Sequence, residues 1–304
     1  MIRTPQLPEM RPVFWSRWSA LNIHRGAFIA IAAIAIAGFP HASAVSLPTI
    51  ALIAAPVILL LGVPHGAFDV ALSKSRWPIH DRLGLAVFLA AYIGIALLAG
   101  FIWWMLPGYA LAVFLAASAY HFAGDWCPGT NRVVERTTLG VALLSAPTIW
   151  YAEDVTAIFG WLAPAPAAVV IATAMAWVAI VALALAAAFA TRDIGRDPLR
   201  SIEIGSALSL GLFCPPVVFF TIYFCGLHAP RHILAVRAEL KPASMVALAR
   251  ASLPYAPLAI LGILLGALLL THIDVGANVL AAIFLGLAVL TAPHMALIDL
   301  RAPK

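Results

Sequence analysis

Five histidines lie in or at the ends of strongly apolar segments, where a polar ring is costly. They occur in four short motifs, GVPHGAFDV (62–70), SAYHFAGDW (118–126), FCGLHAPRH (224–232) and LTAPHMALID (290–299). The third motif carries two of them, His228 and His232, whose spacing of four places both on one face of a helix. Neutral imidazole is a good ligand for iron, zinc, copper and nickel. The motifs therefore predict one metal site built from His65, His121, His228, His232 and His294.

Carboxylates recur just after these histidines. Asp69, Asp125 and Asp299 follow His65, His121 and His294 by four, four and five residues. A carboxylate that accepts a hydrogen bond from a ligand histidine fixes its tautomer and orientation. We expect the three aspartates, and Glu203 as a fourth candidate, to hold the histidines from behind, although they could instead cap helix ends or face water. Carboxylates are too few for a di-iron carboxylate centre.

Aromatic side chains are dense around the same motifs. They could line a cavity for a long apolar substrate, or they could face lipid, as aromatic residues of membrane proteins commonly do. The candidates for the cavity wall are Phe68, Phe122, Trp126, Phe220, Phe224 and Met295.

The composition is that of a membrane protein. Of 304 residues, 63% are hydrophobic and 10% are charged, and the mean hydropathy is +1.01. A soluble domain carries about 25% charged residues. Because long apolar runs recur and alternating strand patterns do not, the sequence predicts an all-α, polytopic transmembrane helical bundle rather than a barrel. The net charge of +5 lies in short loops, so it indicates membrane orientation and not nucleic-acid binding.

About ten helices are expected from the apolar runs. The runs lie near 26–40, 46–64, 83–106, 108–124, 138–151, 165–190, 201–214, 216–238, 253–271 and 276–298. The double proline Pro215-Pro216 separates two of them, because proline breaks a helix, and the first of that pair is expected to be short or re-entrant.

The loop charges predict the topology. Basic loops at 72–82, 125–137 and 191–203 alternate with the uncharged turn 106–108 and the acidic turn 153–154. Basic loops favour the cytoplasm, so both termini are expected there. Each histidine motif then lies near the cytoplasmic end of a helix that runs inward, with His228 deeper by about one turn, roughly 5 Å. We therefore expect the metal site toward the cytoplasmic side of the inner (plasma) membrane.

Two regions are predicted. Residues 1–45 form a basic tail and a first apolar helix, and residues 46–304 form a single transmembrane catalytic domain. The tetrapeptide HASA (41–44) resembles a signal-peptide cleavage site, so the first apolar segment is either a retained helix or a cleaved segment.

In order and approximate spacing, the four motifs resemble those of the Brp/Blh family of membrane-bound β-carotene 15,15′-dioxygenases. The resemblance covers about residues 46–301, and its most specific block is CPPVVFFTIYFCGLHAPRH (214–232). Two features depart from it: the first 45 residues look like an extension, and Pro230 lies inside the histidine pair.

The resemblance implies cleavage of the central double bond of β-carotene by O2 into two molecules of all-trans-retinal. It implies Fe2+ held by His65, His121, His228 and His232. It further implies a catalytic role for His294, either as a metal ligand or as a residue that supports the ligands. It implies a second catalytic role for Tyr223, in contact with the substrate or an oxygen intermediate. The implied partners are β-carotene from the bilayer, O2, and a retinal-binding rhodopsin that accepts the product.

Other functions remain open from the residues alone. A histidine-lined metal or proton transporter would need polar groups at several depths, whereas here they gather toward one side. Another membrane metalloenzyme acting on a lipid, such as a desaturase, would need more histidines for two irons, and a bis-histidine haem protein is a third alternative. A rhodopsin is disfavoured because the lysines, Lys74, Lys241 and Lys304, lie outside the helix centres.

Overall fold

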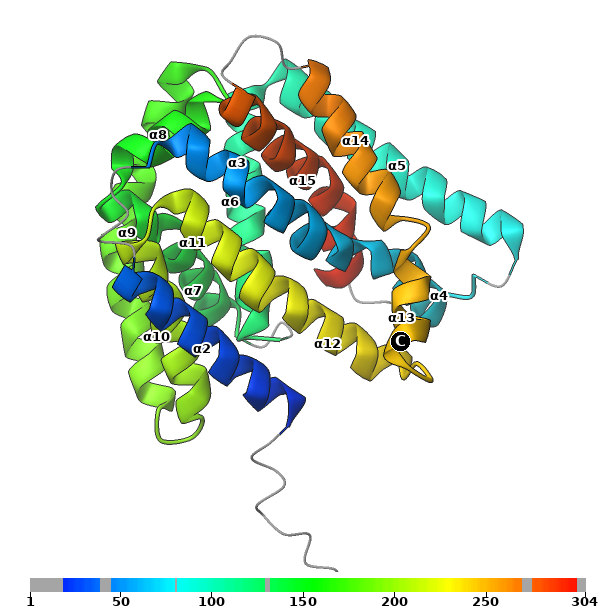
Figure 1. The fold of residues 1–304 in the computed structure, drawn as a ribbon, viewed down its shortest axis with the longest axis horizontal. Coiled ribbons are helices and arrows are strands. Elements are labelled where there is room, and N and C mark those ends of the chain that lie inside the picture. Colours follow the sequence, from blue (N-terminus) through cyan, green and yellow to red (C-terminus); the bar gives the residue numbers. More distant parts are fainter. Residues whose placement is uncertain (1–18, 39–44, 80, 129–131, 270–274, 300–304) are drawn as a thin grey trace, which may run out of the picture.

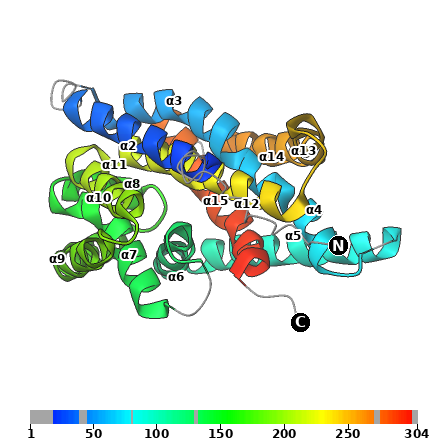
Figure 2. The same cartoon turned by 90° about the horizontal axis from the view of Figure 1, so that it is seen from below.

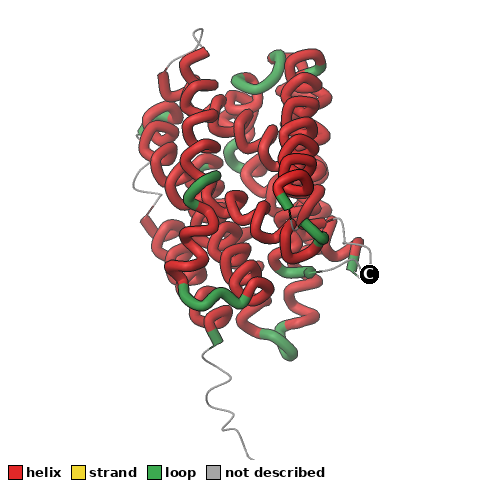
Figure 3. Tube along the Cα trace, turned by 90° about the vertical axis from the view of Figure 1, so that its right-hand side faces the viewer, coloured by secondary structure: helices red, strands yellow, loops and turns green. Residues whose placement is uncertain are grey.

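The structure is helical throughout its described parts. The computed structural model describes residues 19–38, 45–79, 81–128, 132–269 and 275–299, and no strand occurs within these ranges (Figure 1). Most of the helices run roughly along one direction, as in a transmembrane bundle (Figure 3). The predicted all-α class is confirmed, whereas the HASA motif lies outside the described residues.

Most helices are continuous, and the segments that carry His65 and His228 are interrupted by short π and 3-10 turns. In chain order the elements are α2 (Ala20–Gly38), α3 (Leu47–Val57), the π turn η2 (Ile58–Gly62), the 3-10 turn η3 (Val63–Phe68), α4 (Asp69–Arg76), α5 (Arg82–Met105), α6 (Pro107–Phe122), the 3-10 turn η4 (Ala123–Asp125), α7 (Val133–Ser145), the 3-10 turn η5 (Ala146–Ile149), α8 (Ala152–Gly160), α9 (Ala165–Asp193), α10 (Pro198–Phe213), α11 (Pro216–Tyr223), the π turn η6 (Phe224–His228), α12 (Ala229–Leu240), α13 (Met245–Ser252), α14 (Ala256–Leu269) and α15 (Val275–Asp299).

Local sequence signals explain where several helices begin and end. The side chains of Asp81 and Asp197 accept hydrogen bonds from the backbone N–H groups of Gly84 (2.7 Å) and Arg200 (3.0 Å), which caps α5 and α10. Proline occupies the first turn of α6, α10 and α11, where its missing N–H costs nothing. Because α10 ends at Phe213 and α11 begins at Pro216, the predicted break at the double proline is confirmed.

Six helical stretches of the described residues are long and apolar enough to cross a membrane, or seven if α13 and α14 form one bent span. Two of the six are composite: Leu47–Arg76 runs from α3 to α4, and Pro216–Leu240 from α11 to α12. The predicted count of about ten is not confirmed, because α6, α7 and α10 have only 13 to 16 residues and two further short helices, α8 and α13, occur between the predicted runs. The cytoplasmic location of the termini stays a prediction.

The composite helix α11–η6–α12 lies in the middle of the bundle. The view from below has α2 and α3 on one side of it and α6 and α7 on the other (Figure 2). In addition α15 packs against α3, α5 and α14, and α2 packs against α10 and α12. The four segments that carry histidines therefore approach one another from different sides.

Helices α6 and α7 touch at Gly140. A Cβ atom at this position would overlap the backbone carbonyl of Ala119, two residues before His121. We expect Gly140→Ala to force the two helices apart and to lower the free energy of unfolding by about 3 kcal/mol or more, because backbone cannot yield as a side chain can. Thermal unfolding of the detergent-purified protein measures this effect.

Gly205 provides the matched control. It lies inside α10, and a Cβ there would have no atom within 4 Å. Since alanine forms helices better than glycine, Gly205→Ala should leave the unfolding temperature unchanged or raise it slightly. An unfolding temperature of Gly140→Ala equal to that of the unchanged protein would contradict the close approach of α6 and α7.

Candidate metal centre

All five histidines of the apolar segments meet at one place in the bundle, as their shared depth predicted. The ring centre of His65 is 5.2, 5.5 and 5.1 Å from those of His228, His232 and His294. The ring of His121 closes the group, at 5.1 Å from His228 and 5.3 Å from His294, and His232 is 5.1 Å from His294. His294 therefore has as many close ring neighbours as His65, and it is part of the cluster rather than its periphery.

Three of these rings are held by an aspartate through Nδ1. The pairs are His121 with Asp299 (3.0 Å), His228 with Asp125 (3.1 Å) and His294 with Asp69 (2.9 Å). His65 instead directs Nδ1 at the carbonyl of Gly62, at 2.5 Å. Because an ionised carboxylate or a carbonyl can only accept, each Nδ1 carries the proton, and each Nε2 is left with its lone pair.

The aspartates link the segments in a chain. Each of Asp69, Asp125 and Asp299 follows a histidine of its own segment, but each pairs with a histidine of another segment. The i,i+4 spacing along a single helix places the carboxylate one turn beyond its own histidine, where the ring of a neighbouring helix is within reach. The sequence predicted that these carboxylates approach histidines, and the tertiary structure decides which ones.

The cluster fits a metal ion. The Nε2 atoms of His121, His228, His232 and His294 are buried and have no hydrogen-bond partner among the described residues, and a bound cation would satisfy such lone pairs. Two imidazoles that bind one ion through Nε2 at about 2.1 Å and near-tetrahedral angles have ring centres about 5 Å apart. The observed separations of 5.1 to 5.5 Å agree with that arrangement. Asp69 adds a carboxylate oxygen within 4.8 Å of ring nitrogens of His232 and His294.

Two π turns orient the rings of His65 and His228, and the sequence did not predict these turns. The turn η2 leads into the segment of His65, and η6 ends at His228. Such wide turns are frequent at functional sites, because they rotate the following residues relative to a regular helix. They touch at Gly62, where a Cβ would overlap the ring of Phe224. The prolines just before or after these histidines, which prevent regular helical hydrogen bonding, were the available signal.

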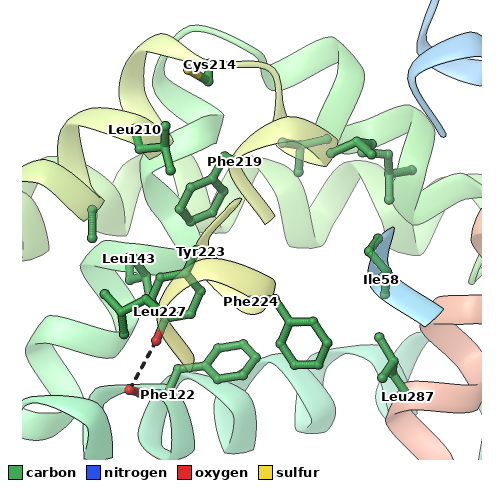
Figure 4. Packing of buried hydrophobic residues seen from close by; sticks show 14 of the residues in the cluster. Ile58, Phe122, Leu143, Leu210, Cys214, Phe219, Tyr223, Phe224, Leu227 and Leu287 are labelled. Carbon is green, nitrogen blue, oxygen red and sulfur yellow. Dashed lines mark hydrogen bonds between the residues drawn. The ribbon is translucent and has the colours of Figure 1, made fainter. Parts of the chain in front are cut away.

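An apolar chamber adjoins the histidines, and most of its wall along α6, α11 and α15 precedes the histidines of these segments. Its wall begins at His65, His121 and His228 and continues along α6 through Ser118 to Leu111. Other parts come from α8, α11 and α15. The ring of Phe220 stacks on Phe224 with centres 5.1 Å apart and touches Phe284 at 5.0 Å, so aromatic faces cover one side. Figure 4 shows Phe122, Phe219 and Phe224 within this packing.

Three of the predicted wall residues are Phe122, Phe220 and Phe224, and these do line the chamber. Phe68, Trp126 and Met295 are not among the residues that line this chamber. Phe68 and Trp126 follow their histidines by three and five residues, whereas most of the chamber wall along α6, α11 and α15 precedes the histidines. Phe68 packs instead with Leu72, Val236, Leu248 and Leu297.

Tyr223 lies behind His228 and does not line the chamber. Its hydroxyl is 2.8 Å from Asp125 Oδ2 and 3.2 Å from the carbonyl of Phe122 (Figure 4). The prediction that Tyr223 contacts substrate is therefore not supported by its position, which is that of a second holder of Asp125. Asp125 thus connects His228 with the tyrosine that precedes it by five residues.

Glu203 is fully buried, and it pairs with arginines rather than with histidines. It forms ion pairs with Arg231 and with Arg25, the latter at 3.2 Å. Arg231 in turn donates to the backbone carbonyl of Asp125 at 2.9 Å. Glu203 therefore reaches His228 only through Arg231 and Asp125, one layer further out than predicted.

The chain is similar to known proteins of one family. The family model for beta-carotene 15,15'-dioxygenase matches residues 56–301. A protein of the uncultured marine bacterium 66A03, named Beta-carotene 15,15'-dioxygenase, is 28% identical over 192 residues, which are 61% of this chain and 69% of the relative. No solved structure matches the chain. Because the family match spans most of the chain and contains all four histidine motifs, the chain belongs to the beta-carotene 15,15'-dioxygenase family.

Proposed function

We propose that the protein cleaves the central double bond of β-carotene with O2 and releases two molecules of all-trans-retinal. The main observation in support of this proposal is the apolar chamber that ends on His65, His121 and His228. From Leu111 to His121 its wall follows α6 for about 15 Å at a rise of about 1.5 Å per residue, which is about half the length of β-carotene. A molecule with one of its halves in this chamber has its middle bond beside the histidine rings.

The histidines would hold a ferrous ion. His65, His121, His228 and His232 are the proposed ligands, with His294 as a fifth donor, since its Nε2 is buried and unpaired like those of His121, His228 and His232. Bound iron would supply the redox chemistry with O2 that imidazole ligands support. The aspartates keep Nδ1 protonated, so that every Nε2 presents a lone pair to the ion.

The chamber wall would position the polyene and exclude water. Among the described residues that line it, the only polar side chains apart from the histidines are those of Ser118 and Thr291. Such a wall offers a polyene contact with aromatic faces and no competing hydrogen bonds. Because β-carotene dissolves in the bilayer core, we propose that it enters from the lipid of the inner membrane, with the metal toward the cytoplasmic side. A retinal-binding rhodopsin is the proposed acceptor of the product.

A transporter is the main alternative, and the wall composition argues against it. A path for protons or metal ions needs polar groups at successive depths. On the chamber side of the histidines, the lining residues of α8 are Val155, Ile158 and Phe159, all apolar. A lipid-soluble substrate fits this wall better than an ion does.

Expression in a β-carotene-producing bacterium tests the proposal. Membranes that contain the protein, with iron and oxygen supplied, should lose their carotenoid colour, and extracts should contain retinal. Purified protein should then give two molecules of retinal for each β-carotene consumed, which separates central from off-centre cleavage. Inserted, iron-containing protein that forms no retinal would overturn the proposed reaction.

Asp125 should tune the metal affinity. Asp125→Asn keeps the size of the side chain but removes the charged acceptor shared by His228 and Tyr223. Loss of a carboxylate that holds a ligand histidine costs about 10- to 100-fold in metal affinity. We expect that loss in an iron-chelator competition assay, whereas Glu153→Gln, which changes an exposed acid on α8, should have no effect. Equal affinities for both variants would exclude the assigned part of Asp125.

A further inference from the structure

Pro230 leaves a backbone carbonyl without its usual partner close to the metal site. In a regular helix the carbonyl of Gly226 would accept from the N–H of residue 230. Residue 230 is proline, which has no N–H. Gly226 lies within η6, the π turn that ends at His228. The turn that aims a proposed ligand is thus also a turn whose own helical bonding is incomplete.

The first helix supplies a donor to that carbonyl. Nε2 of His24, on α2, lies 2.9 Å from the oxygen of Gly226. Because a carbonyl oxygen only accepts, the imidazole donates through a protonated Nε2. His24 and Gly226 are 202 residues apart in sequence, so this bond is a purely tertiary replacement for the missing helical one.

Other contacts hold α2 in place at the same turn. Phe28, one turn after His24, is completely buried, and its ring is 3.8 Å from where a Cβ at Gly226 would lie. Arg25 pairs with Asp197, the residue that caps α10, at 3.1 Å and with Glu203 at 3.2 Å. In Figure 1 α2 lies beside α10 and α12. The position of His24 is therefore fixed by packing and charge together.

A second line of contacts runs from α2 to the same histidine. Arg25 and Arg231 share the buried carboxylate of Glu203, and Arg231 donates to the carbonyl of Asp125. Asp125 accepts from Nδ1 of His228. Consequently α2 supports the backbone of His228 through His24 and the ring of His228 through Arg25.

We propose that His24 is a positioning residue of the metal centre, acting through its hydrogen bond to the π turn that carries His228. The inference rests on the proposed metal site and deepens it, because α2 (Ala20–Gly38) precedes the residues that match the family, 56–301. The π turn and Pro230 set the direction of His228, and His24 stabilises that turn. The first helix is in this sense a part of the metal centre.

Two amide variants separate the hydrogen bond from the bulk of the side chain. The amide nitrogen of glutamine occupies about the place of imidazole Nε2, whereas that of asparagine falls short. We expect His24→Gln to bind Co2+ as the unchanged protein does, and His24→Asn and His24→Ala to bind it about tenfold more weakly. The visible ligand-field absorption of the Co2+-loaded full chain in detergent should change only in the latter two. Ile34→Ala, which trims an exposed side chain of α2, is the control.

Pro230→Ala provides an independent test, because it restores an N–H at residue 230. The effect of His24→Ala on Co2+ affinity should then be smaller in the Pro230→Ala background, since the two changes act on one carbonyl. Equal effects in both backgrounds, or a His24→Gln variant as impaired as His24→Asn, would overturn the inference. Absence of Co2+ and Fe2+ binding by the unchanged protein would instead overturn the proposed metal site itself.

Discussion

Replacing His228 with alanine should remove the metal and abolish retinal formation. His228 contacts the rings of His65 and His121, and its Nε2 is buried without a partner. Loss of a partner that merely holds a ligand costs about 10- to 100-fold, so loss of the ligand itself should lower iron affinity by more than about 100-fold. Iron measured per purified chain and retinal measured per cell should therefore fall together.

The contacts around Asp125 should keep the His228→Ala variant folded. Alanine leaves Asp125 without its imidazole partner, although Tyr223 and the backbone-bonded Arg231 keep its position. The protein should accordingly remain folded, which size-exclusion chromatography in detergent can check. His272→Ala, a change outside the four motifs, is the control and should retain both iron and activity. Full iron retention by His228→Ala would contradict the assignment of His228 as a metal ligand.

Filling the chamber next to the histidines should stop the reaction without removing the metal. Ser118 lies on α6, one turn before His121, lines the chamber, and has an Oγ with no hydrogen-bond partner among the described residues. Ser118→Leu would put a branched apolar group where the polyene is proposed to lie. Since a displacement of about 1 Å from reacting geometry can cost 100-fold, we expect kcat/KM for β-carotene to fall at least about tenfold.

The matched control is Ser118→Ala at the same position. It removes only the unpaired hydroxyl, so neither cavity shape nor hydrogen bonding changes much, and kcat/KM should stay close to that of the unchanged protein. Iron content should be equal in the two variants, because Ser118 is not one of the proposed metal ligands. Unchanged kcat/KM in Ser118→Leu would mean that the substrate lies elsewhere.

The contrast between the two predictions separates the two halves of the site. His228→Ala acts on the layer of histidines, and Ser118→Leu acts on the apolar chamber wall, most of which precedes the histidines along α6, α11 and α15. The third layer, Asp69, Asp125 and Asp299, follows the histidines and holds them. Each layer therefore has its own expected signature: metal lost, substrate excluded, or metal weakened.

Position along the helices could be read from the sequence. The basic loops and apolar runs predicted a common depth for His65, His121, His232 and His294, with His228 about one turn deeper, and the five histidines do meet. The break at Pro215-Pro216 was likewise predictable, because proline acts on its own helix and needs no partner. Such features depend on local chemistry and on distance from the helix ends.

Rotation about the helix axes and the choice of neighbours came only with the tertiary structure. These helices carry apolar side chains on all faces, so no periodic polar face indicates which side points into the bundle. That is why Phe68 and Trp126 were predicted for the chamber wall and Tyr223 for substrate contact, although the first two lie beyond the histidines and Tyr223 bonds to Asp125.

The sequence by itself determined which residues could form a metal centre and that they lie at similar positions along their helices, since residue types, spacing and loop charges are one-dimensional information. Only the tertiary structure decided which aspartate holds which histidine, where the chamber lies, and that His24 replaces the hydrogen bond that Pro230 cannot donate. The physical reason is that close contacts such as those at Gly62 and Gly140 set how helices rotate against one another. Such contacts join residues far apart in the chain, and no local pattern encodes them.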